Sequence, residues 1–382
     1  MSFYFDNAAT TFPKPPEVYD FMDSFYRTCG GNAGRGQYKQ AANSTKITSE
    51  TRELLKELLQ CQNKDVVFTP SATIALNMII QGLVRKTQIK NIWISPFEHN
   101  AVTRVLENLK NSEKININIL PIDDSFEYDF NLINQKFTEN KPELVILSHG
   151  SNVCGLINPV EELCEIAKRF NAITVLDMAQ TAGLVPLNVG NNNFDFAVFA
   201  GHKTLLGPFG ISGFVKNKTT DLPTFLFGGT GVESANQKMP EEMPYKYEMG
   251  SQNIQAIAGL HEALKWWLSN TDAIRQKEKE NHKRLFDLIS SYNFIKIIGC
   301  KDLEKSIGVI SCLFDNYTAD EIGNVLDEQD VAVRTGLQCS PLAHKTLKTF
   351  PAGTVRFSVQ YYTSDSDFEG LKKALDYIKE NI

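Results

Sequence analysis

Short apolar runs alternate with stretches of helical periodicity through the first half of the chain. The apolar runs predict buried strands at residues 66–69, 91–95, 143–150, 172–177, 195–201 and 210–216. Between them, apolar positions recur with helical spacing over 72–83, 99–109 and 160–170. Strands and helices in alternation are typical of βαβ units, so we predict a mostly parallel sheet covered by helices.

The flanking segments predict a second, smaller part of the molecule. Residues 44–60 are expected to form an amphipathic helix with a Ser or Thr as its N-cap, and 227–244, rich in Gly, Pro and polar residues, a long surface loop. Further on, the pattern predicts helices over 254–289, 319–328 and 368–380 and strands at 308–314, 331–333 and 353–359. We therefore expect an α/β fold with a large domain of residues 15–252 and a small α+β domain formed by residues 1–14 and 253–382.

Composition narrows the class of protein. The 382 residues carry a formal net charge of −6, which gives no electrostatic footprint for nucleic acid or an anionic membrane. No apolar run approaches the roughly 20 residues of a membrane span, and the N-terminus lacks the apolar core of a signal peptide, so we expect a cytoplasmic protein. Seven scattered cysteines without a CxxC pair indicate neither a disulfide framework nor a zinc site.

Two charged residues follow neighbouring apolar runs. Asp177 ends the run 172–176, and Lys203 comes shortly after the run 194–200. The carboxyl ends of strands in an open parallel sheet line the ligand crevice, so both side chains should face one site. An amine that forms an imine and a carboxylate that pairs with a cationic ring nitrogen are what an enzyme needs to hold pyridoxal phosphate.

Other polar groups follow the same predicted strands. Ser71 and Thr73, at a helix start, offer hydroxyls and backbone N–H groups to a phosphate, although capping of the helix explains them better when they are taken alone. His99 could stack on a cofactor ring or simply cap its helix. Asn152 and Gln180 could contact the substrate carboxylate and the ring hydroxyl, or make ordinary loop hydrogen bonds.

The second half of the chain adds a thiol and a guanidinium. Cys339 lies in a Gly-containing loop, where a mobile, exposed thiol near cationic groups such as Arg334 or His344 would be a nucleophile. A structural cysteine is the alternative, and one Cys with one His does not make a metal site. Arg356 interrupts an apolar strand, so it needs a substrate carboxylate or a structural salt bridge as its partner.

These strings together resemble the cysteine desulfurase and selenocysteine lyase group of the class V aminotransferases, which are fold-type I pyridoxal phosphate enzymes. The resemblance runs through YFDNAATTFPKP, GRGQY, PSATIALN, FEHNAV, SHGSNVCGLINP, DMAQTAG, GHKTLLGPFGI, EMGSQN, RTGLQCSPLAH and GTVRFS, in the family's order. It covers nearly the whole chain, and ten strings in order are far more specific than any one.

The resemblance implies a role for each matching residue. Lys203 would be joined covalently to the cofactor, Asp177 would pair with its ring nitrogen, and His99 would stack on the ring. Gln180 would contact the ring oxygen, and Asn152 and Arg356 would hold the substrate carboxylate. The phosphate would be bound by Ala72, Thr73, His202 and, from the other subunit of a homodimer, Ser251. Two hydroxyl residues common in the family are replaced here by Ala72 and Ala200.

We therefore expect a pyridoxal phosphate enzyme that converts L-cysteine to alanine and leaves the sulfur on Cys339 as a persulfide, for transfer to an acceptor protein. A selenocysteine lyase, or a lyase, epimerase or aminotransferase acting on another amino acid, is the alternative within enzymes. Cys339 favours the desulfurase because a plain aminotransferase has no use for a thiol there. A non-catalytic scaffold is the alternative from another class, and intact Lys203, Asp177 and His99 argue against it.

Overall fold

The computed structural model describes residues 2–34, 36 and 38–381, so two positions of the GRGQY string, 35 and 37, lie outside the described residues. The larger part contains the elements α1 (Pro16–Cys29), α2 (Lys39–Leu58), β2 (Asp65–Thr69), α3 (Ala72–Lys86), β3 (Asn91–Ile94), α4 (Asn100–Ser112), β4 (Asn116–Ile119), α5 (Phe130–Glu139), β5 (Leu144–Ser148), α6 (Val160–Arg169), β6 (Ile173–Asp177), β7 (Phe196–Ala200) and β8 (Ser212–Lys216).

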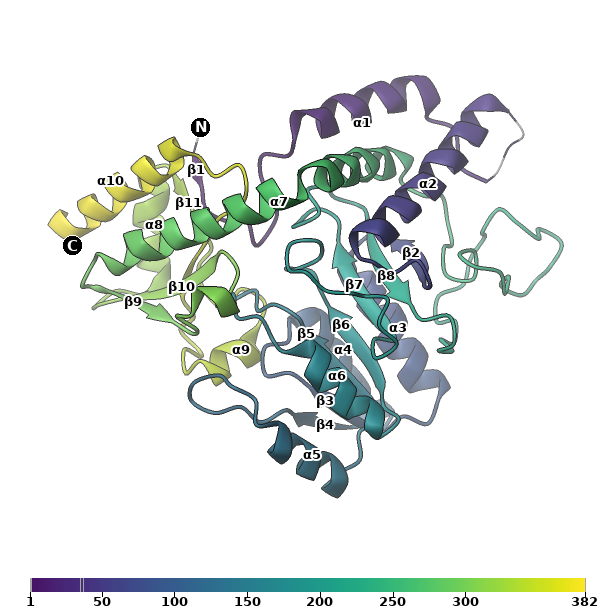
Figure 1. Ribbon diagram of the computed structural model, residues 1–382, viewed down its shortest axis with the longest axis horizontal. Coiled ribbons are helices and arrows are strands. Elements are labelled where there is room, and N and C mark those ends of the chain that lie inside the picture. Colours follow the sequence, from purple (N-terminus) through teal and green to yellow (C-terminus); the bar gives the residue numbers. More distant parts are fainter. Residues whose placement is uncertain (1, 35, 37, 382) are drawn as a thin grey trace.

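A seven-stranded sheet forms the centre of this part (Figure 1). Its strand order is β2-β8-β7-β6-β5-β3-β4, and β8 is antiparallel to both of its neighbours while the pairs from β7 to β4 are parallel. The predicted mostly parallel sheet is therefore confirmed. Parallel strands need helical crossovers, and these bring every parallel strand's carboxyl end to one edge.

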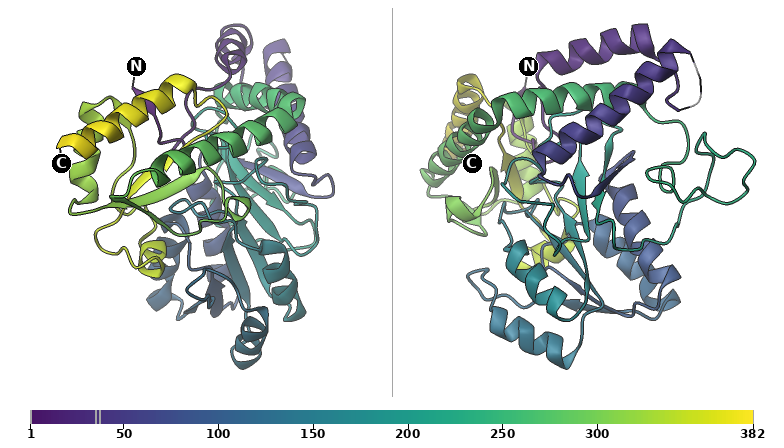
Figure 2. Two further views of the ribbon diagram at one scale, coloured as in Figure 1. Left: turned by 60° about the vertical axis from the view of Figure 1, so that its left-hand side comes forward. Right: turned by 45° about the vertical axis from the view of Figure 1, so that its right-hand side comes forward.

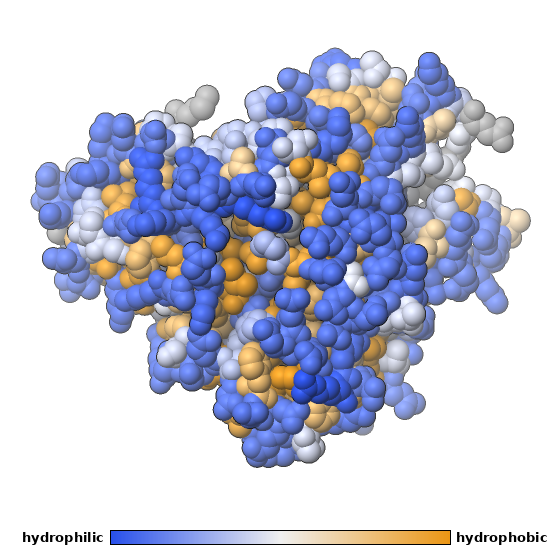
Figure 3. All heavy atoms as spheres, in the orientation of Figure 1, coloured by the Kyte–Doolittle hydropathy of each residue, from blue (hydrophilic) through white to orange (hydrophobic). Residues whose placement is uncertain are grey.

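Both faces of the sheet are buried, which explains the unbroken apolar runs. Along β5, Val145 and Leu147 belong to the core on one face, and Leu144 and Ile146 to the core on the other. Residues of α2, α6 and α7 fill the first core, and residues of α3 and α4 fill the second. The outer face shown in Figure 3 is mostly hydrophilic, as expected for the exposed side of covering helices.

The smaller part is built on antiparallel strands. It contains β9 (Ile295–Ile298), η1 (Leu303–Lys305), β10 (Val309–Phe314), α8 (Ala319–Glu328), β11 (Val331–Ala332), α9 (Pro341–Thr346), β12 (Val355–Ser358) and α10 (Asp365–Asn381). A three-stranded sheet has the order β12-β10-β9, and β11 pairs in parallel with the N-terminal β1 (Phe3–Tyr4). The chain start thus lies beside this part (Figure 2).

One long helix connects the two parts. Helix α7 (Ile254–Ser290) packs against α1 and α2, has non-helical angles at Asn270, and ends near β9 (Figure 1). The division at residues 252 and 253 stays a prediction, since α7 reaches from one part to the other. In the described part of the chain, none of the helices combines the length and the apolar character that crossing a bilayer demands.

The structure also adds elements that the pattern did not predict: α1, β1, β4, α5, β9 and α9. Strand β4 reads Asn-Ile-Asn-Ile and lies at the sheet edge, so it lacks a continuous apolar run. The expected start of α2 is wrong. The helix begins at Lys39 rather than near Ser44, and Ser44 lies inside it, where its hydroxyl donates to the carbonyl of Cys29 (2.9 Å) instead of capping the helix.

Candidate active site

The edge formed by the carboxyl ends of the parallel strands carries the predicted site. Ser148, at the end of β5, lies directly beside Asp177, at the end of β6, and Asp177 pairs with Val198 in β7. The turn after β7 contains His202 and Lys203. The parallel register therefore gathers residues that are far apart in the sequence, and this is the convergence that the sequence predicts.

Asp177 is buried and Lys203 is partly buried, and the opposite charges of the two side chains act on each other. The Asp177 side chain accepts a hydrogen bond from the Ala179 N–H (2.9 Å), and burial raises the pKa of this carboxyl while Lys203 opposes the rise. Burial lowers the pKa of Lys203 to about 8, and Asp177 limits that shift. An amine with this pKa is partly unprotonated near neutral pH, as nucleophilic attack on an aldehyde requires.

His99 is the N-cap of α4, as the alternative interpretation holds, but only one of its ring nitrogens serves the cap. Nδ1 accepts the Ala101 N–H (3.0 Å), which leaves Nε2 available. Burial, followed by the charges of Lys203 and Arg334, lowers the pKa of His99 to about 4. The ring is therefore neutral at ordinary pH, and a neutral flat ring is suited to stacking on a cofactor.

The start of α3 and the turn after β7 offer groups to a phosphate. Ser71 caps α3 by accepting the Ile74 N–H (3.3 Å), and Thr73 is exposed on the first turn, beside Ala72. His202 stacks on the exposed Phe209 ring with a centroid distance of 4.7 Å. Its Nδ1 is buried without a hydrogen-bond partner among the described residues. A buried ring nitrogen without a partner is unusual, and a bound acceptor or donor would satisfy it.

Gln180 and Ser251 are positioned by other segments of the chain. The Gln180 amide nitrogen donates to the Ala8 carbonyl (2.8 Å), so the N-terminal segment holds this side chain in place. Ser251 is exposed just before α7, where its hydroxyl accepts a hydrogen bond from Asn32 (3.2 Å). That contact ties Ser251 to the segment before α2, and no hydrogen bond between the described residues ties it to Asp177 or Lys203.

Arg356 has the structural salt bridge that sequence analysis left open as an alternative. It is 2% exposed, and it donates to Asp6 (2.6 Å) and to the Asn152 carbonyl (2.9 Å). Its Nε is buried without a partner in the described structure. The Nε–H is thus a donor that a ligand could use.

Cys339 is exposed on a loop with unusual backbone angles. Gln338 and Cys339 have φ values of 38° and 59°, which non-glycine residues seldom adopt. The loop is closed at its base, where Gly336 and Thr354 exchange two backbone hydrogen bonds of 3.1 Å. A Cβ at Gly353 would lie 2.3 Å from the Gly336 backbone, so this close approach requires glycine.

A network of side chains holds the loop in this conformation. The Asn152 amide donates to the Gln338 carbonyl (2.8 Å) and accepts from the Ser340 hydroxyl (2.7 Å), so it bonds both sequence neighbours of Cys339. The Cys339 carbonyl accepts the Asn100 N–H (2.8 Å), next to His99. The thiol is therefore exposed, as predicted, but the loop that carries it is fixed by hydrogen bonds.

The two cations expected near the thiol differ in the structure. Arg334 lies 3.7 Å from the Cys339 sulfur, as expected. The expectation for His344 is wrong: it is fully buried, bonds Gln338 (2.8 Å) and Thr349 (2.7 Å), and burial lowers its pKa to about 4. It is therefore neutral at ordinary pH, and it supports the loop instead of activating the thiol.

Two further residues of the site were missed. Asp6 is the ion-pair partner of Arg356. The feature of the sequence that could have indicated it is a lone carboxylate in the string YFDNAATT. Glu98 is fully buried beside His99, and one of its oxygens accepts the Ser148 N–H (2.6 Å) while the other has no partner in the described chain. Burial raises the pKa of Glu98 to about 8, with a smaller contribution from Asp177. Its signal was a charged residue soon after an apolar strand.

The residues present fit pyridoxal phosphate. Among the described residues, the unpartnered Nδ1 of His202 lies in the same turn as Lys203, Asp177 is a buried carboxylate whose pKa is influenced by Lys203, and Arg356 has an Nε without a partner. His202 could bind a phosphate, Asp177 could pair with a pyridinium nitrogen, and Arg356 could bind a substrate carboxylate.

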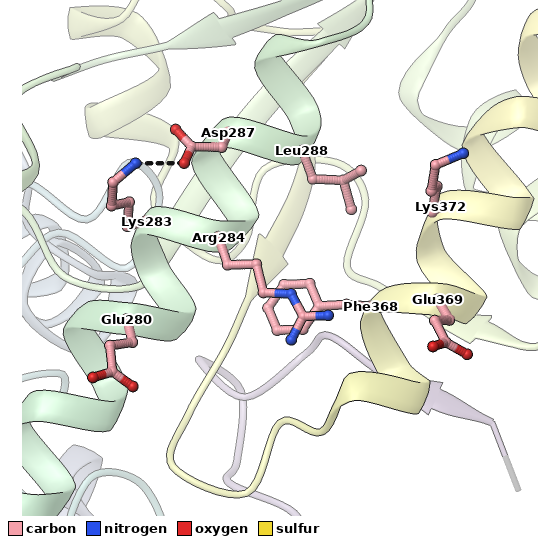
Figure 4. A pocket seen from close by; sticks show the side chains of 8 residues that line it. All are labelled: Glu280, Lys283, Arg284, Asp287, Leu288, Phe368, Glu369 and Lys372. Carbon is pink, nitrogen blue, oxygen red and sulfur yellow. Dashed lines mark hydrogen bonds and ion pairs between the residues drawn. The ribbon is translucent and has the colours of Figure 1, made fainter.

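A large hollow elsewhere on the surface does not share this chemistry. It lies between α7 and α10, has a volume of about 580 Å³, and is lined by Glu280, Lys283, Arg284, Asp287, Leu288, Phe368, Glu369 and Lys372 (Figure 4). Its basic side chains are already paired or stacked: Lys283 bonds Asp287 (2.5 Å), Lys372 bonds Asp376 (2.6 Å), and Arg284 lies over the Phe368 ring at 4.2 Å. We therefore place the active site at the strand ends.

Comparison with known proteins points to the same site. A family model described as aminotransferase class-V matches residues 3–371. A protein of Pyrococcus abyssi named as a probable cysteine desulfurase is 30% identical, over 99% of this chain and 94% of its own. A protein of Methanothermobacter thermautotrophicus with the same name is also 30% identical, over 98% of this chain and 94% of its own.

Solved structures agree with this match. The apo cysteine desulfurase of Thermococcus onnurineus superposes with a TM-score of 0.90 at 28% identity, covering 100% of this chain and 95% of its own. A cysteine desulfurase of Escherichia coli, in an S-sulfonic acid form, has a TM-score of 0.83 at 25% identity, covering 99% of this chain and 95% of its own.

Proposed function

Since the chain belongs to the class-V aminotransferase family, we propose that it is a pyridoxal phosphate-dependent cysteine desulfurase and that Cys339 is its sulfur acceptor. The observation that carries the proposal is the position of Cys339. The thiol is exposed on a fixed loop, and the loop's backbone is bonded to Asn100, beside His99 at the same strand-end crevice as Lys203.

The chain's own residues have distinct tasks in this reaction. The bound cofactor supplies an electron-withdrawing ring that makes the substrate's Cα proton acidic. Lys203 would hold the cofactor covalently and, with its amine freed, would take up that proton. Asp177 would keep the ring nitrogen protonated, because a buried carboxylate stabilises a neighbouring positive charge. His99 would stack on the ring, and Gln180 would contact its oxygen.

Phosphate and substrate are held at opposite ends of the site. We assign the phosphate to the α3 start at Ala72 and Thr73 and to His202, with Ser251 reaching the partner subunit's cofactor in a homodimer. We assign the substrate carboxylate to Arg356, whose Nε is free, and to the second N–H of the Asn152 amide. The bidentate geometry of a guanidinium suits a carboxylate.

The sulfur transfer itself balances without an external oxidant. The Cys339 thiolate attacks the substrate sulfur, an S–S bond forms, and the substrate C–S bond breaks. The electron pair of that bond stays with the substrate carbon, which takes a proton to give alanine. Cysteine plus a thiolate thus become alanine plus a persulfide anion, and a thiol-bearing acceptor protein would take the outer sulfur in the next step.

The proposal is tested by mass spectrometry of the protein after exposure to L-cysteine. Cys339 should gain the mass of one sulfur atom, and Cys339→Ala should abolish both this adduct and sulfide release under reducing conditions. Cys300→Ala, which removes another partly exposed thiol, should change neither. Undiminished sulfide release from Cys339→Ala rules out the proposed mechanism, and a parallel assay with L-selenocysteine separates a selenocysteine lyase.

A further inference from the structure

Two neighbouring cavities lie behind the predicted site, between the larger and the smaller part. The outer one, of about 360 Å³, is lined by Ile157, Leu184, Val185, Pro186, Arg275, Glu278, Lys279, His282, Leu303, Glu304, Ser306, Ile307 and Gly308. Figure 3 shows hydrophobic surface in the hollow beneath α7, between the two parts. This cavity shares no lining residue with the Cys339 loop, so it does not belong to the sulfur-accepting face.

The inner cavity borders the outer one and is lined by Lys203. It has a volume of about 30 Å³, and Lys203, Gln180 and Thr204 line one side of it. Leu184, Glu278, Ile307 and Gly308 line both cavities, so the two are adjacent. Because a water molecule needs about 10–15 Å³, the inner cavity has room for about two or three of them.

Gln360 supplies the polar groups that such water molecules need. It lines the inner cavity and is 1% exposed, and neither its amide nitrogen nor its amide oxygen has a partner in the described chain. Its backbone is fixed, since the Asn281 side chain donates to its carbonyl (2.8 Å). Leaving both atoms of a buried amide without hydrogen bonds destabilises the fold, and water in the cavity would satisfy them.

Glu278 lines both cavities and has little to hold its charge. Its carboxylate accepts the Tyr361 N–H (3.2 Å), and burial raises its pKa to about 8. The charged groups around it are occupied elsewhere: Arg275 donates to the Gly183 carbonyl (2.8 Å), and Lys279 pairs with Glu304 (3.1 Å).

One more titratable group on the same helix face contributes no charge. Burial lowers the pKa of His282 to about 4, so this ring is neutral at ordinary pH. The titratable side chains that line the outer cavity are thus Glu278, His282, Arg275, Lys279 and Glu304. At the inner cavity, the titratable lining residues are Glu278 and Lys203. Glu278 is therefore a carboxyl that can both gain and lose a proton near neutral pH.

We propose that Gln360 and Glu278 hold a short file of water molecules behind Lys203, and that this file exchanges protons between Lys203 and solvent. Lys203 passes a proton to the nearest water, Glu278 takes one from the file, and the outer cavity returns it to bulk water. No bond other than those to hydrogen is made or broken. The proposal rests on the proposed function, because it gives Lys203 a proton to exchange.

The test follows the fate of deuterium from L-[2-²H]cysteine in ordinary water. Deuterium that Lys203 takes from Cα is either returned to alanine or lost to solvent. In Glu278→Gln and Gln360→Leu, the loss of deuterium from Lys203 to solvent should slow about tenfold, which is less than a full general acid–base contribution. More deuterium should therefore stay in the alanine. Glu280→Gln, the same substitution on an exposed carboxylate of the same helix, should behave as the unaltered protein. Equal retention in all four proteins overturns the proposal.

A second measurement does not depend on turnover. A high-resolution crystal structure of the cofactor-free protein should show ordered water bonded to both Gln360 amide atoms and to Glu278, and Gln360→Leu should lose that water while melting at a similar temperature. A dry inner cavity overturns the proposal even when alanine is formed. Failure of the proposed function is a separate result, in which the unaltered protein forms no alanine but the water is present.

Discussion

The strand-end pair Asp177 and Lys203 and the Cys339 loop reach the same crevice by different physical means. The first two residues follow buried strands, and the backbone ladder of the sheet fixes where they end. Cys339 follows the two-residue strand β11, and its loop is held by side-chain hydrogen bonds, chiefly from Asn152, which is far away in sequence, and from the nearby buried His344.

The difference shows where each part is sensitive. A sheet ladder distributes its hydrogen bonds over many residues, so replacing Asp177 or Lys203 removes chemistry without removing structure. The loop depends on a few buried side-chain bonds, each worth about 1–3 kcal/mol when its partner is left unsatisfied. Replacing one of these supports should move the thiol while leaving the cofactor end intact.

Lys203→Ala should have the largest effect. Loss of the amine that holds the cofactor and moves the proton should lower turnover of L-cysteine about 10³-fold, within the range of acid–base and nucleophilic contributions. The free energy of unfolding should hold or rise, because the Lys203 amine has a pKa lowered by burial and the change removes that cost. Steady-state kinetics and urea unfolding measure the two.

Lys64→Met is the matched control for this prediction. Lys64 is a buried lysine, and its ammonium donates to the carbonyls of Asn191 (2.7 Å) and Phe194 (2.6 Å). Its loss should destabilise the fold and spare the chemistry. If Lys203→Ala destabilised the protein as Lys64→Met does, the contrast between chemistry and structure at the strand ends would be wrong.

The sequence predicts the strand-end half of the site well because the signals are local. Each apolar run marks a strand buried on both faces, and the residue that ends it marks the crevice, as Asp177 does. The same reasoning fails for β4 and α5 at the sheet edge, where burial is partial and the apolar pattern is weak.

The other half of the site depends on contacts that no local pattern encodes. His344 looked like a possible cation near Cys339, and only the fold shows that it is buried and bonded to Gln338. Asp6 is 350 positions away from Arg356 in the sequence, yet it neutralises that residue. Such pairings depend on how the chain start packs beside β12, which hydrophobic periodicity does not describe.

The loop should be more sensitive to acid than the strand-end pair. His344 is neutral in the fold with a pKa of about 4, whereas in the unfolded chain it titrates near 6.5. Between these values the unfolded state binds more protons, so stability falls as the pH falls, by up to about 3 kcal/mol from this residue. His344→Gln should flatten that part of the curve of unfolding free energy against pH.

Hydrogen exchange locates the effect. At pH 5, backbone exchange within residues 334–344 should be faster than at pH 7 after correction for the intrinsic rate, and His344→Gln should reduce the difference. His282→Gln is the control, because His282 also has a pKa of about 4 but lies away from the loop. If His282→Gln reduced the difference in exchange between pH 5 and pH 7 as much as His344→Gln does, the acid sensitivity of the loop would not come from His344.

Asn152→Ala should loosen the loop by about 2 kcal/mol, since it removes the partners of both the Gln338 carbonyl and the Ser340 hydroxyl. We expect slower persulfide formation on Cys339 and an unchanged visible absorbance of the bound cofactor. Ser340→Ala removes one of the two bonds and should give a smaller change. An altered cofactor spectrum in Asn152→Ala would contradict the separation of the two halves.

Asp177→Asn should have the smallest effect on stability, and in the opposite direction. Burial raises the pKa of Asp177, so the folded protein favours its protonated form, and stability is lost as the pH rises through that pKa. In the cofactor-free protein the neutral amide should therefore stabilise the fold by about 1 kcal/mol at pH 8 and by less at pH 5, a size typical of replacing a functional group. The same variant should retain the cofactor less firmly.

Asp195→Asn is the control: Asp195 is a buried carboxylate that accepts the Thr174 N–H (2.8 Å) and pairs with Lys168, so the change should cost about 3 kcal/mol of stability. A loss of stability in cofactor-free Asp177→Asn would mean that this carboxylate supports the fold as Asp195 does, and that the strand ends carry structure as well as chemistry.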